Sequence, residues 1–107
     1  MTVVLDRAYF AHMTGADRAL QGEIVVLFRG QAPEWAGLLA PGAPWRDVAH
    51  TIKGTARGIG LMALAEACEA AEGADAGRIE TALALLRAAL GAALAALEQW
   101  AADEAQN

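Results

Sequence analysis

One apolar repeat dominates residues 79–102, which read IETALALLRAALGAALAALEQWAA. Its large apolar side chains recur every three or four residues, at Ile79, Leu83, Leu86, Leu90, Leu94 and Leu97. Because an α-helix turns once in about 3.6 residues, this spacing gathers them into one stripe. The stretch therefore predicts a long amphipathic helix, with Asp75 as its N-cap and its end near Trp100.

The same stretch is the part of the sequence most easily taken for a membrane span, over Thr81–Ala102. It carries Arg87 and Glu98, and alanine fills most positions between the leucines. Charged residues are unfavourable in the middle of a lipid-facing helix, whereas a leucine stripe suits the core of a bundle. We therefore expect a bundle helix and no membrane contact.

Turn-forming residues divide the rest of the chain into a short leader and three further helices. The leader, about Val4 to Met13, places Leu5, Ala8, Tyr9 and His12 at helical spacing. Thr14 and Asp17 resemble a capping box for the second helix. That helix is expected to kink near Gly30 or Pro33, and its predicted stripe comprises Leu20, Ile24, Leu27, Phe28, Trp35, Leu38 and Leu39.

A third helix is predicted to open at Pro44, because proline suits the first helical position. Its apolar face comprises Trp45, Val48, Ala49, Ile52, Ala56 and Ile59. A fourth helix follows Gly60, with Leu61, Leu64, Ala65 and Cys68 on its apolar face. Short loops between amphipathic helices predict an all-α fold: an antiparallel four-helix bundle with a short N-terminal helix, formed as one domain over residues 1–107.

Composition agrees with a helical fold and narrows the partners. The 107 residues include 28 alanines and 13 leucines but only 14 valines, isoleucines and threonines together, which favours helices over strands. The net charge of −5 argues against a nucleic-acid partner, which needs a basic face. The lone cysteine, Cys68, cannot form an intramolecular disulfide, and MTVVLDRAYF does not resemble a secretory signal. We expect a cytoplasmic monomer.

Chemistry enters on the third helix, where a histidine faces away from the predicted core. With Ile52 at zero and about 100° per residue, His50 falls near 160° on the helical wheel. Arg46, Lys53 and Arg57 lie close to it, within an otherwise acidic protein. Such a cluster of basic groups attracts and holds an anion, and a phosphoryl group on the imidazole would be such an anion.

Gly54 lies one turn after His50 and costs about 1 kcal/mol of helix propensity relative to alanine. A bare backbone at this place would let the active site of a partner approach the imidazole. No metal site is predicted, because no third ligand at suitable spacing joins His12 and His50.

The segment AHTIKGTARGIG, residues 49–60, resembles the signature of histidine-containing phosphotransfer (HPt) domains. In that family H-x-x-K-G is followed by a glycine ten residues after the histidine, which here is Gly60. The resemblance implies a carrier rather than an autonomous enzyme, with His50 as phosphoacceptor, Lys53 neutralising phosphoryl oxygens and Gly54 leaving clearance. Arg57 and Gly60 are possible supporting residues. The family often has a polar amide at the position of Gly58, so a contact made there is expected to be missing.

The resemblance also implies the partners. These are response-regulator receiver domains, which would supply Mg²⁺ and an acidic pocket, and a histidine kinase that can itself be a hybrid; the chain binds no cofactor of its own. The related phosphoacceptor domain of chemotaxis kinases has an acidic side chain on the next helix. Glu72, and with less weight Glu69, lies at a matching offset and could accept a hydrogen bond from the imidazole N–H.

Two other interpretations remain open from the sequence. A helical-bundle adaptor could bind a receiver or kinase without being phosphorylated, or the chain could be a phosphoacceptor domain of a chemotaxis-type kinase. Acid-labile, base-stable phosphate on His50 would separate the carrier from the adaptor. Kinase domains downstream in the full gene product would identify the chemotaxis-type arrangement.

Overall fold

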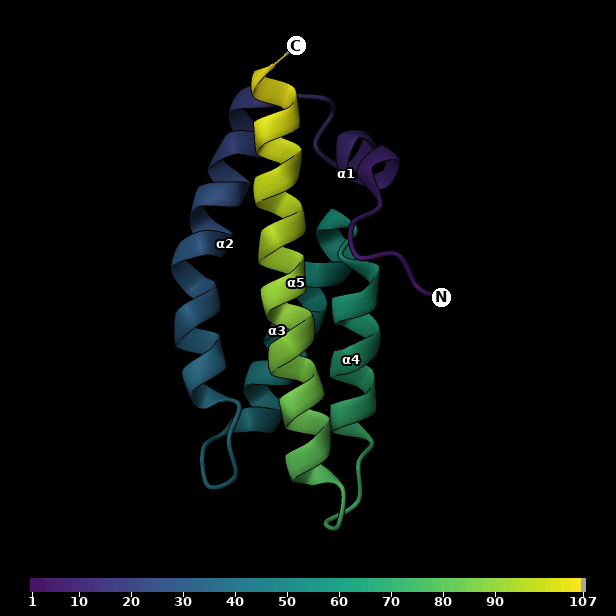
Figure 1. Cartoon of the computed structure of the whole chain (residues 1–107), viewed down its shortest axis with the longest axis vertical. Coiled ribbons are helices and arrows are strands. Elements are labelled where there is room, and N and C mark those ends of the chain that lie inside the picture. Colours follow the sequence, from purple (N-terminus) through teal and green to yellow (C-terminus); the bar gives the residue numbers. More distant parts are fainter. Residues whose placement is uncertain (107) are drawn as a thin grey trace.

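The computed structural model describes residues 1–106, in which all regular structure is helical. Four long helices run alternately up and down the long axis, and a short one lies across the end where the third meets the fourth (Figure 1). This confirms the predicted four-helix bundle. The helices are α1 (Arg7–Met13), α2 (Arg18–Leu38), α3 (Trp45–Ile59), α4 (Met62–Glu72) and α5 (Ile79–Ala105).

The core lies where the inner faces of the four long helices meet. α3 packs mainly on α4, and α5 packs on both α4 and α2. The predicted stripes of α3, α4 and α5 point inward, and the fully buried leucines of α5 are central to the core. Those leucines and their counterparts on α3 and α4 are Leu83, Leu86, Leu97, Ala49, Ile52, Ala56, Leu64 and Cys68.

The predicted stripe of α2 is wrong in phase. Leu20, Leu27 and Leu38 are substantially exposed, and the side chains that α2 buries are Gln21, Val25, Phe28 and Ala32. Apolar residues occupy nearly every position from Ile24 to Phe28, so more than one face of this helix could have been its inner one. The packing of α2 on α5 selects between them and leaves part of the apolar surface open to solvent.

The leader also differs from its prediction, because Phe10 is its buried residue while Ala8 and His12 are exposed. Phe10 packs edge-on against Trp100 of α5, with ring centroids 5.1 Å apart. This aromatic contact ties the short helix α1 to the end of α5 that extends beyond α3 and α4.

Helix ends depart from the predictions in three places. The capping box is wrong, because Thr14 ends α1 and its hydroxyl donates to the Phe10 carbonyl, whereas Asp17 alone caps α2 by accepting from the Leu20 N–H. α5 begins at Ile79 rather than after Asp75, since residues 75–78 form a turn first, and it continues to Ala105.

The other departures are small. Pro44 precedes the first residue of α3 rather than occupying it. α2 continues as one helix through Gly30 and Pro33.

Gly60 makes the tight turn between α3 and α4 possible. Its φ of +90° lies in the left-handed region, and its N–H donates to the Ala56 carbonyl. Its own carbonyl accepts from the Asp6 N–H at 2.8 Å, and an added Cβ would lie only 3.0 Å from the Asp6 carbonyl oxygen. A side chain is therefore excluded twice, by backbone conformation and by the approach of the segment leading into α1.

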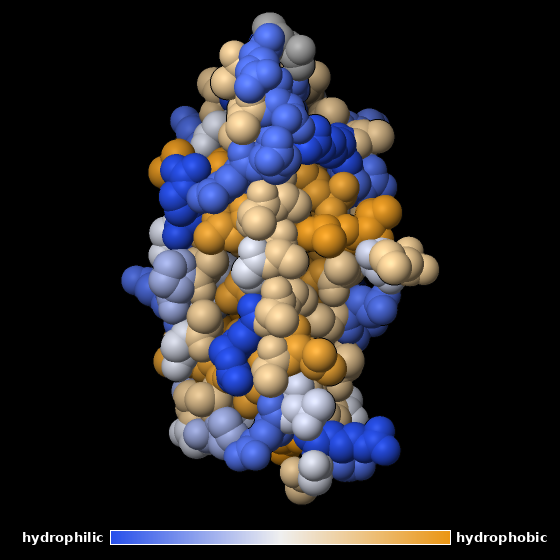
Figure 2. Space-filling view, viewed as in Figure 1, coloured by the Kyte–Doolittle hydropathy of each residue, from blue (hydrophilic) through white to orange (hydrophobic). Residues whose placement is uncertain are grey.

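By length and composition α5 could cross a membrane. Its hydropathy has two sources: the leucines that face the core and alanines on the outer face. Figure 2 shows this outer face as largely apolar, with hydrophilic residues gathered mainly towards the two ends of the molecule. The buried leucines account for the role of α5 within the bundle, in keeping with the predicted bundle helix.

Cys68 is a core residue of α4 with no exposed surface. Burial, and next the negative charge of Glu72, raise the pKa of its thiol to about 12. The thiol therefore stays protonated at neutral pH and is a poor nucleophile.

Candidate functional site

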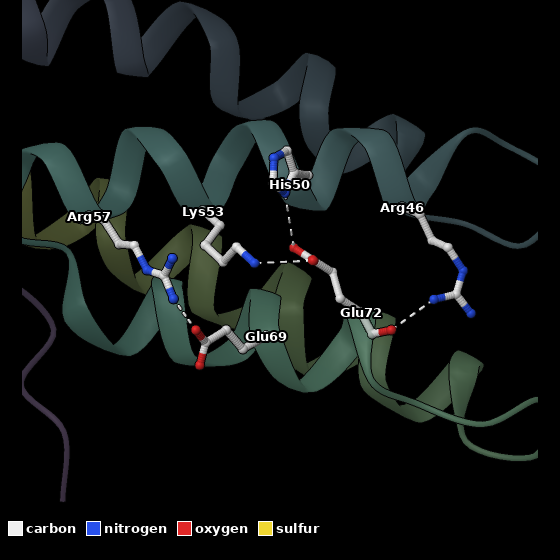
Figure 3. Close-up of polar contacts among 6 residues, drawn as sticks. All are labelled: Arg46, His50, Lys53, Arg57, Glu69 and Glu72. Carbon is white, nitrogen blue, oxygen red and sulfur yellow. Dashed lines mark hydrogen bonds and ion pairs between the residues drawn. The ribbon is translucent and has the colours of Figure 1, made fainter.

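His50 lies on the outer face of α3, with 76% of its side chain exposed. Its position follows from the apolar period of the helix, because burying Ala49 and Ile52 turns the intervening residue 50 outward. The side chains that approach the imidazole come from α3 itself and from the last turns of α4 (Figure 3). The prediction that His50 faces solvent is confirmed.

The Glu72 carboxylate links the imidazole to a lysine. Its Oε2 accepts a hydrogen bond from Lys53 Nζ at 3.1 Å, and its Oε1 lies 3.9 Å from His50 Nδ1. That second distance is too long for a hydrogen bond. Oε1 is buried and has no hydrogen-bond partner within residues 1–106. Glu72 therefore presents an unused acceptor towards Nδ1, and Nε2 is the nitrogen on the opposite side of the ring.

Lys53 is held close to the protein surface, with only 14% of its side chain exposed. An ammonium group has three N–H donors, and one of them is committed to Glu72. The Lys53 and Glu72 charges are both largely shielded from water, so removing either would leave the other poorly compensated. The two residues therefore form one unit.

Arg57 and Glu69 form a second pair between α3 and α4, one turn further along. Both side chains are more than half exposed, so the pair is worth about 0.2–1 kcal/mol at most. Glu69 is thus engaged with Arg57, while Glu72 is the acid that faces His50 (Figure 3).

Arg46 points away from the imidazole, as Figure 3 shows. Its Nη1 donates to the backbone carbonyl of Glu72 at 2.8 Å, and its guanidinium lies 4.4 Å from the centre of the Trp45 ring. A cation at the C-terminus of a helix is favourable because unpaired carbonyls point there. Arg46 therefore fastens the end of α4 to the start of α3 and fixes the backbone of Glu72.

Glycines leave the surface beside His50 flat. A Cβ added at Gly54 or Gly58 would meet nothing within 4 Å, so packing does not require glycine at either position. Gly60 differs, because it is buried at the far end of α3, about 15 Å along the helix from His50 at 1.5 Å per residue. The structure thus gathers His50, Lys53, Gly54 and Glu72 and separates Gly60 from them as a turn residue.

The bond between Lys53 and Glu72 was not foreseen from the sequence. The two residues are 19 positions apart on different helices, and their spacing shows only that each is near His50. The available signal was the offset of Glu72 on the following helix together with the wheel position of Lys53. In the part of the chain described, no group of three or more His, Cys, Asp or Glu side chains could hold a metal ion.

The comparisons with known proteins agree with this geometry. The family model of the Hpt domain matches residues 44–100, which contain all the residues of the site. The crystal structure of histidine phosphotransferase ShpA from Caulobacter crescentus is similar, with a TM-score of 0.77 and 38% sequence identity. The alignment covers 97% of this chain and 96% of that one. Curated protein sequences yield no significant match.

Proposed function

Because this chain belongs to the Hpt domain family, we propose that it carries phosphoryl groups in a two-component phosphorelay. His50 accepts the group from an aspartyl phosphate of a response-regulator receiver domain and returns it to another aspartate. The observation that supports this most is the exposed imidazole with a carboxylate oxygen facing its Nδ1. A histidine with its proton on Nδ1 has its lone pair on Nε2, the nitrogen that faces away from Glu72.

The transfer is a substitution at phosphorus. The Nε2 lone pair forms the new N–P bond, the bond from phosphorus to the aspartyl oxygen breaks, and the aspartate leaves as a carboxylate with the electron pair. The imidazole, still protonated on Nδ1, becomes a positively charged phosphoimidazolium. A small movement of the His50 side chain would bring Nδ1–H within hydrogen-bond distance of Glu72 Oε1, where the carboxylate stabilises the developing charge.

Lys53 and Gly54 assist this step in different ways. Lys53 holds Glu72 through one N–H donor, and its remaining donors are free to approach the phosphoryl oxygens and offset their charge. Gly54 presents no side chain beside the imidazole, so the acidic pocket of a receiver can close over it. Arg57 supports the site from the next turn through its pair with Glu69.

The partners follow from the same chemistry. Receiver domains exchange the phosphoryl group with His50, and a histidine kinase, which can be a hybrid kinase, feeds the relay. Mg²⁺ comes with the receiver, where carboxylates would bind it, and the carrier itself acts without a cofactor. In this proposal the chain works in the cytoplasm as a monomer and catalyses nothing without its partner.

Replacing His50 tests the proposal. The protein is incubated with receiver domains phosphorylated by radiolabelled acetyl phosphate in Mg²⁺, and label on the carrier is measured after acid and after base treatment. The wild type should gain acid-labile, base-stable label, and His50→Gln should gain none. His12→Gln is the matched control, because His12 is the other exposed histidine, and it should label normally.

Circular dichroism should show unchanged helix content in both variants, because changes at exposed positions usually cost less than about 0.5 kcal/mol. Label retained by His50→Gln would overturn the assignment of the phosphoacceptor. A wild type that binds receivers without ever gaining label would instead be an adaptor.

A further inference from the structure

An apolar surface on α2 lies open beside α3. Leu27 is 63% exposed and Val26 is 61% exposed. The neighbouring outward residues, Gly22 and Glu23, line a shallow depression together with these two side chains. The inner face of α2 already supplies its share of the core through Val25 and Phe28, so Val26 and Leu27 have no packing role in the described chain.

Leu27 also forms one wall of a groove between α2 and α3. The groove has a volume of about 150 Å³, which suits a single aliphatic side chain, and its lining is almost entirely apolar. Two of its lining residues, Thr55 and Ile59, come from the helix that carries His50. The others are Ile24, Leu27, Phe28 and Gln31.

The surface of α3 between the groove and His50 is uncharged and nearly bare. Thr51, Gly54 and Gly58 are exposed there, and the two glycines have open space where a side chain would be. Thr55 follows His50 by five residues, about 7.5 Å along the helix. One flat partner surface could therefore cover the groove and the imidazole together.

We propose that this groove and the strip Thr51–Gly54–Gly58 form the docking surface for the receiver domain, with Leu27 and Gly58 helping to decide which receiver is accepted. The inference rests on the proposed function. An apolar side chain of the receiver enters the groove as an anchor, while the aspartyl phosphate lies over His50. Anchors of this kind, buried in a pocket near the chemistry, supply much of the energy of an interface.

Charge favours a receiver over a second copy of this chain as the occupant. Beyond Asp47, every formally charged side chain on α3 is basic, namely Lys53 and Arg57, in a protein of net charge −5. A partner that carries an aspartyl phosphate and the carboxylates that bind Mg²⁺ is complementary to this edge and is repelled elsewhere. A second copy would oppose the same cations to each other.

The test compares two exposed leucines. Leu27→Glu places a carboxylate at the groove, and Leu85→Glu places one on the outer face of α5, where Leu85 is 65% exposed. Transfer from a purified receiver domain that phosphorylates the wild type is timed over a range of receiver concentrations. Leu27→Glu should raise the KM for the receiver by about tenfold to a hundredfold, whereas Leu85→Glu should stay within about twofold of wild type.

A second pair of variants checks the strip. Gly58→Leu should raise the KM by about tenfold, and Gly91→Leu, at an equally open position on α5, should leave it unchanged. Helix content by circular dichroism should match wild type in all four variants, because each new side chain points into solvent.

The outcomes separate this inference from the function beneath it. If the wild type exchanges phosphate but Leu27→Glu and Leu85→Glu share its KM, the docking surface is wrong and the carrier function stands. If the wild type accepts phosphate from no receiver, the function fails and this inference with it. If Leu27→Glu leaves the KM unchanged but abolishes a dimer detected by light scattering, the groove binds a second copy and the inference is overturned.

Discussion

The outer faces of α3 and α5 are both helix surfaces that the bundle leaves open, but their chemistry differs. α5 exposes mostly small apolar side chains around one cation, Arg87, whose guanidinium donates to the Leu39 carbonyl. α3 exposes His50, two glycines and basic side chains paired with acids of α4. The exposed small side chains of α5 are Ala84, Ala88, Gly91, Ala92 and Ala95.

Helix stability explains the face of α5 but not that of α3. Alanine is the best helix former, whereas each interior glycine costs about 1 kcal/mol relative to it. Gly54 and Gly58 incur this cost although a side chain would meet nothing in the folded chain. The difference teaches that the stability of this fold and its transfer chemistry depend on separate surfaces, since the reason for a bare backbone at α3 lies outside the chain.

The sharpest way to break this contrast is to put the same side chain on each face. Gly54→Glu should block phosphotransfer, because its bulk and negative charge oppose the anionic pocket of a receiver. Gly91→Glu, at an equally open glycine of α5, should transfer at close to the wild-type rate. Phosphotransfer time courses and circular dichroism on both variants measure this. Equal rates in the two variants would show that clearance at Gly54 does not matter.

A smaller effect is expected from the Lys53–Glu72 unit. Lys53→Ala should slow transfer by about tenfold to a thousandfold, as for the loss of one preorganised donor. Lys53→Arg should keep part of the rate because its charge survives. Glu72→Gln should also slow transfer, and the double variant Lys53→Ala/Glu72→Gln should be little slower than Lys53→Ala alone, since the two residues act together.

Rapid-quench phosphotransfer assays on the two single variants and the double variant provide this double-mutant cycle. Effects that multiply would mean that Lys53 and Glu72 act independently, despite the hydrogen bond between them.

The smallest effect is expected at Arg57. Its pair with Glu69 is exposed, so Arg57→Ala should slow transfer by only about twofold to fivefold at low salt. The deficit should fade at high ionic strength, because exposed charges are screened over a Debye length of about 8 Å in physiological salt. Transfer assays at two salt concentrations test this. If Arg57→Ala fails at both concentrations while Lys53→Ala transfers normally, the roles assigned to the two residues are reversed.

Much of the fold was predictable because several helices carry one clear apolar stripe. The periods of α3 and α5 fixed which side chains enter the core, and the outward direction of His50 followed from the neighbours that α3 buries. α2 was not predictable in the same way, since apolar residues cover more than one of its faces. Only the docking of α2 on α5 determines that Val25 is buried and Leu27 exposed.

By itself, then, the sequence determined the helical bundle, the exposed histidine and the bare backbone beside it, because each depends on spacing within one helix. The tertiary structure decided that Glu72 takes Lys53 and faces His50 while Glu69 takes Arg57. It also decided that Gly60 is a packed turn and that a groove opens between α2 and α3. These features depend on how two elements distant in sequence are set against each other, and helical periodicity carries no information on that relative position.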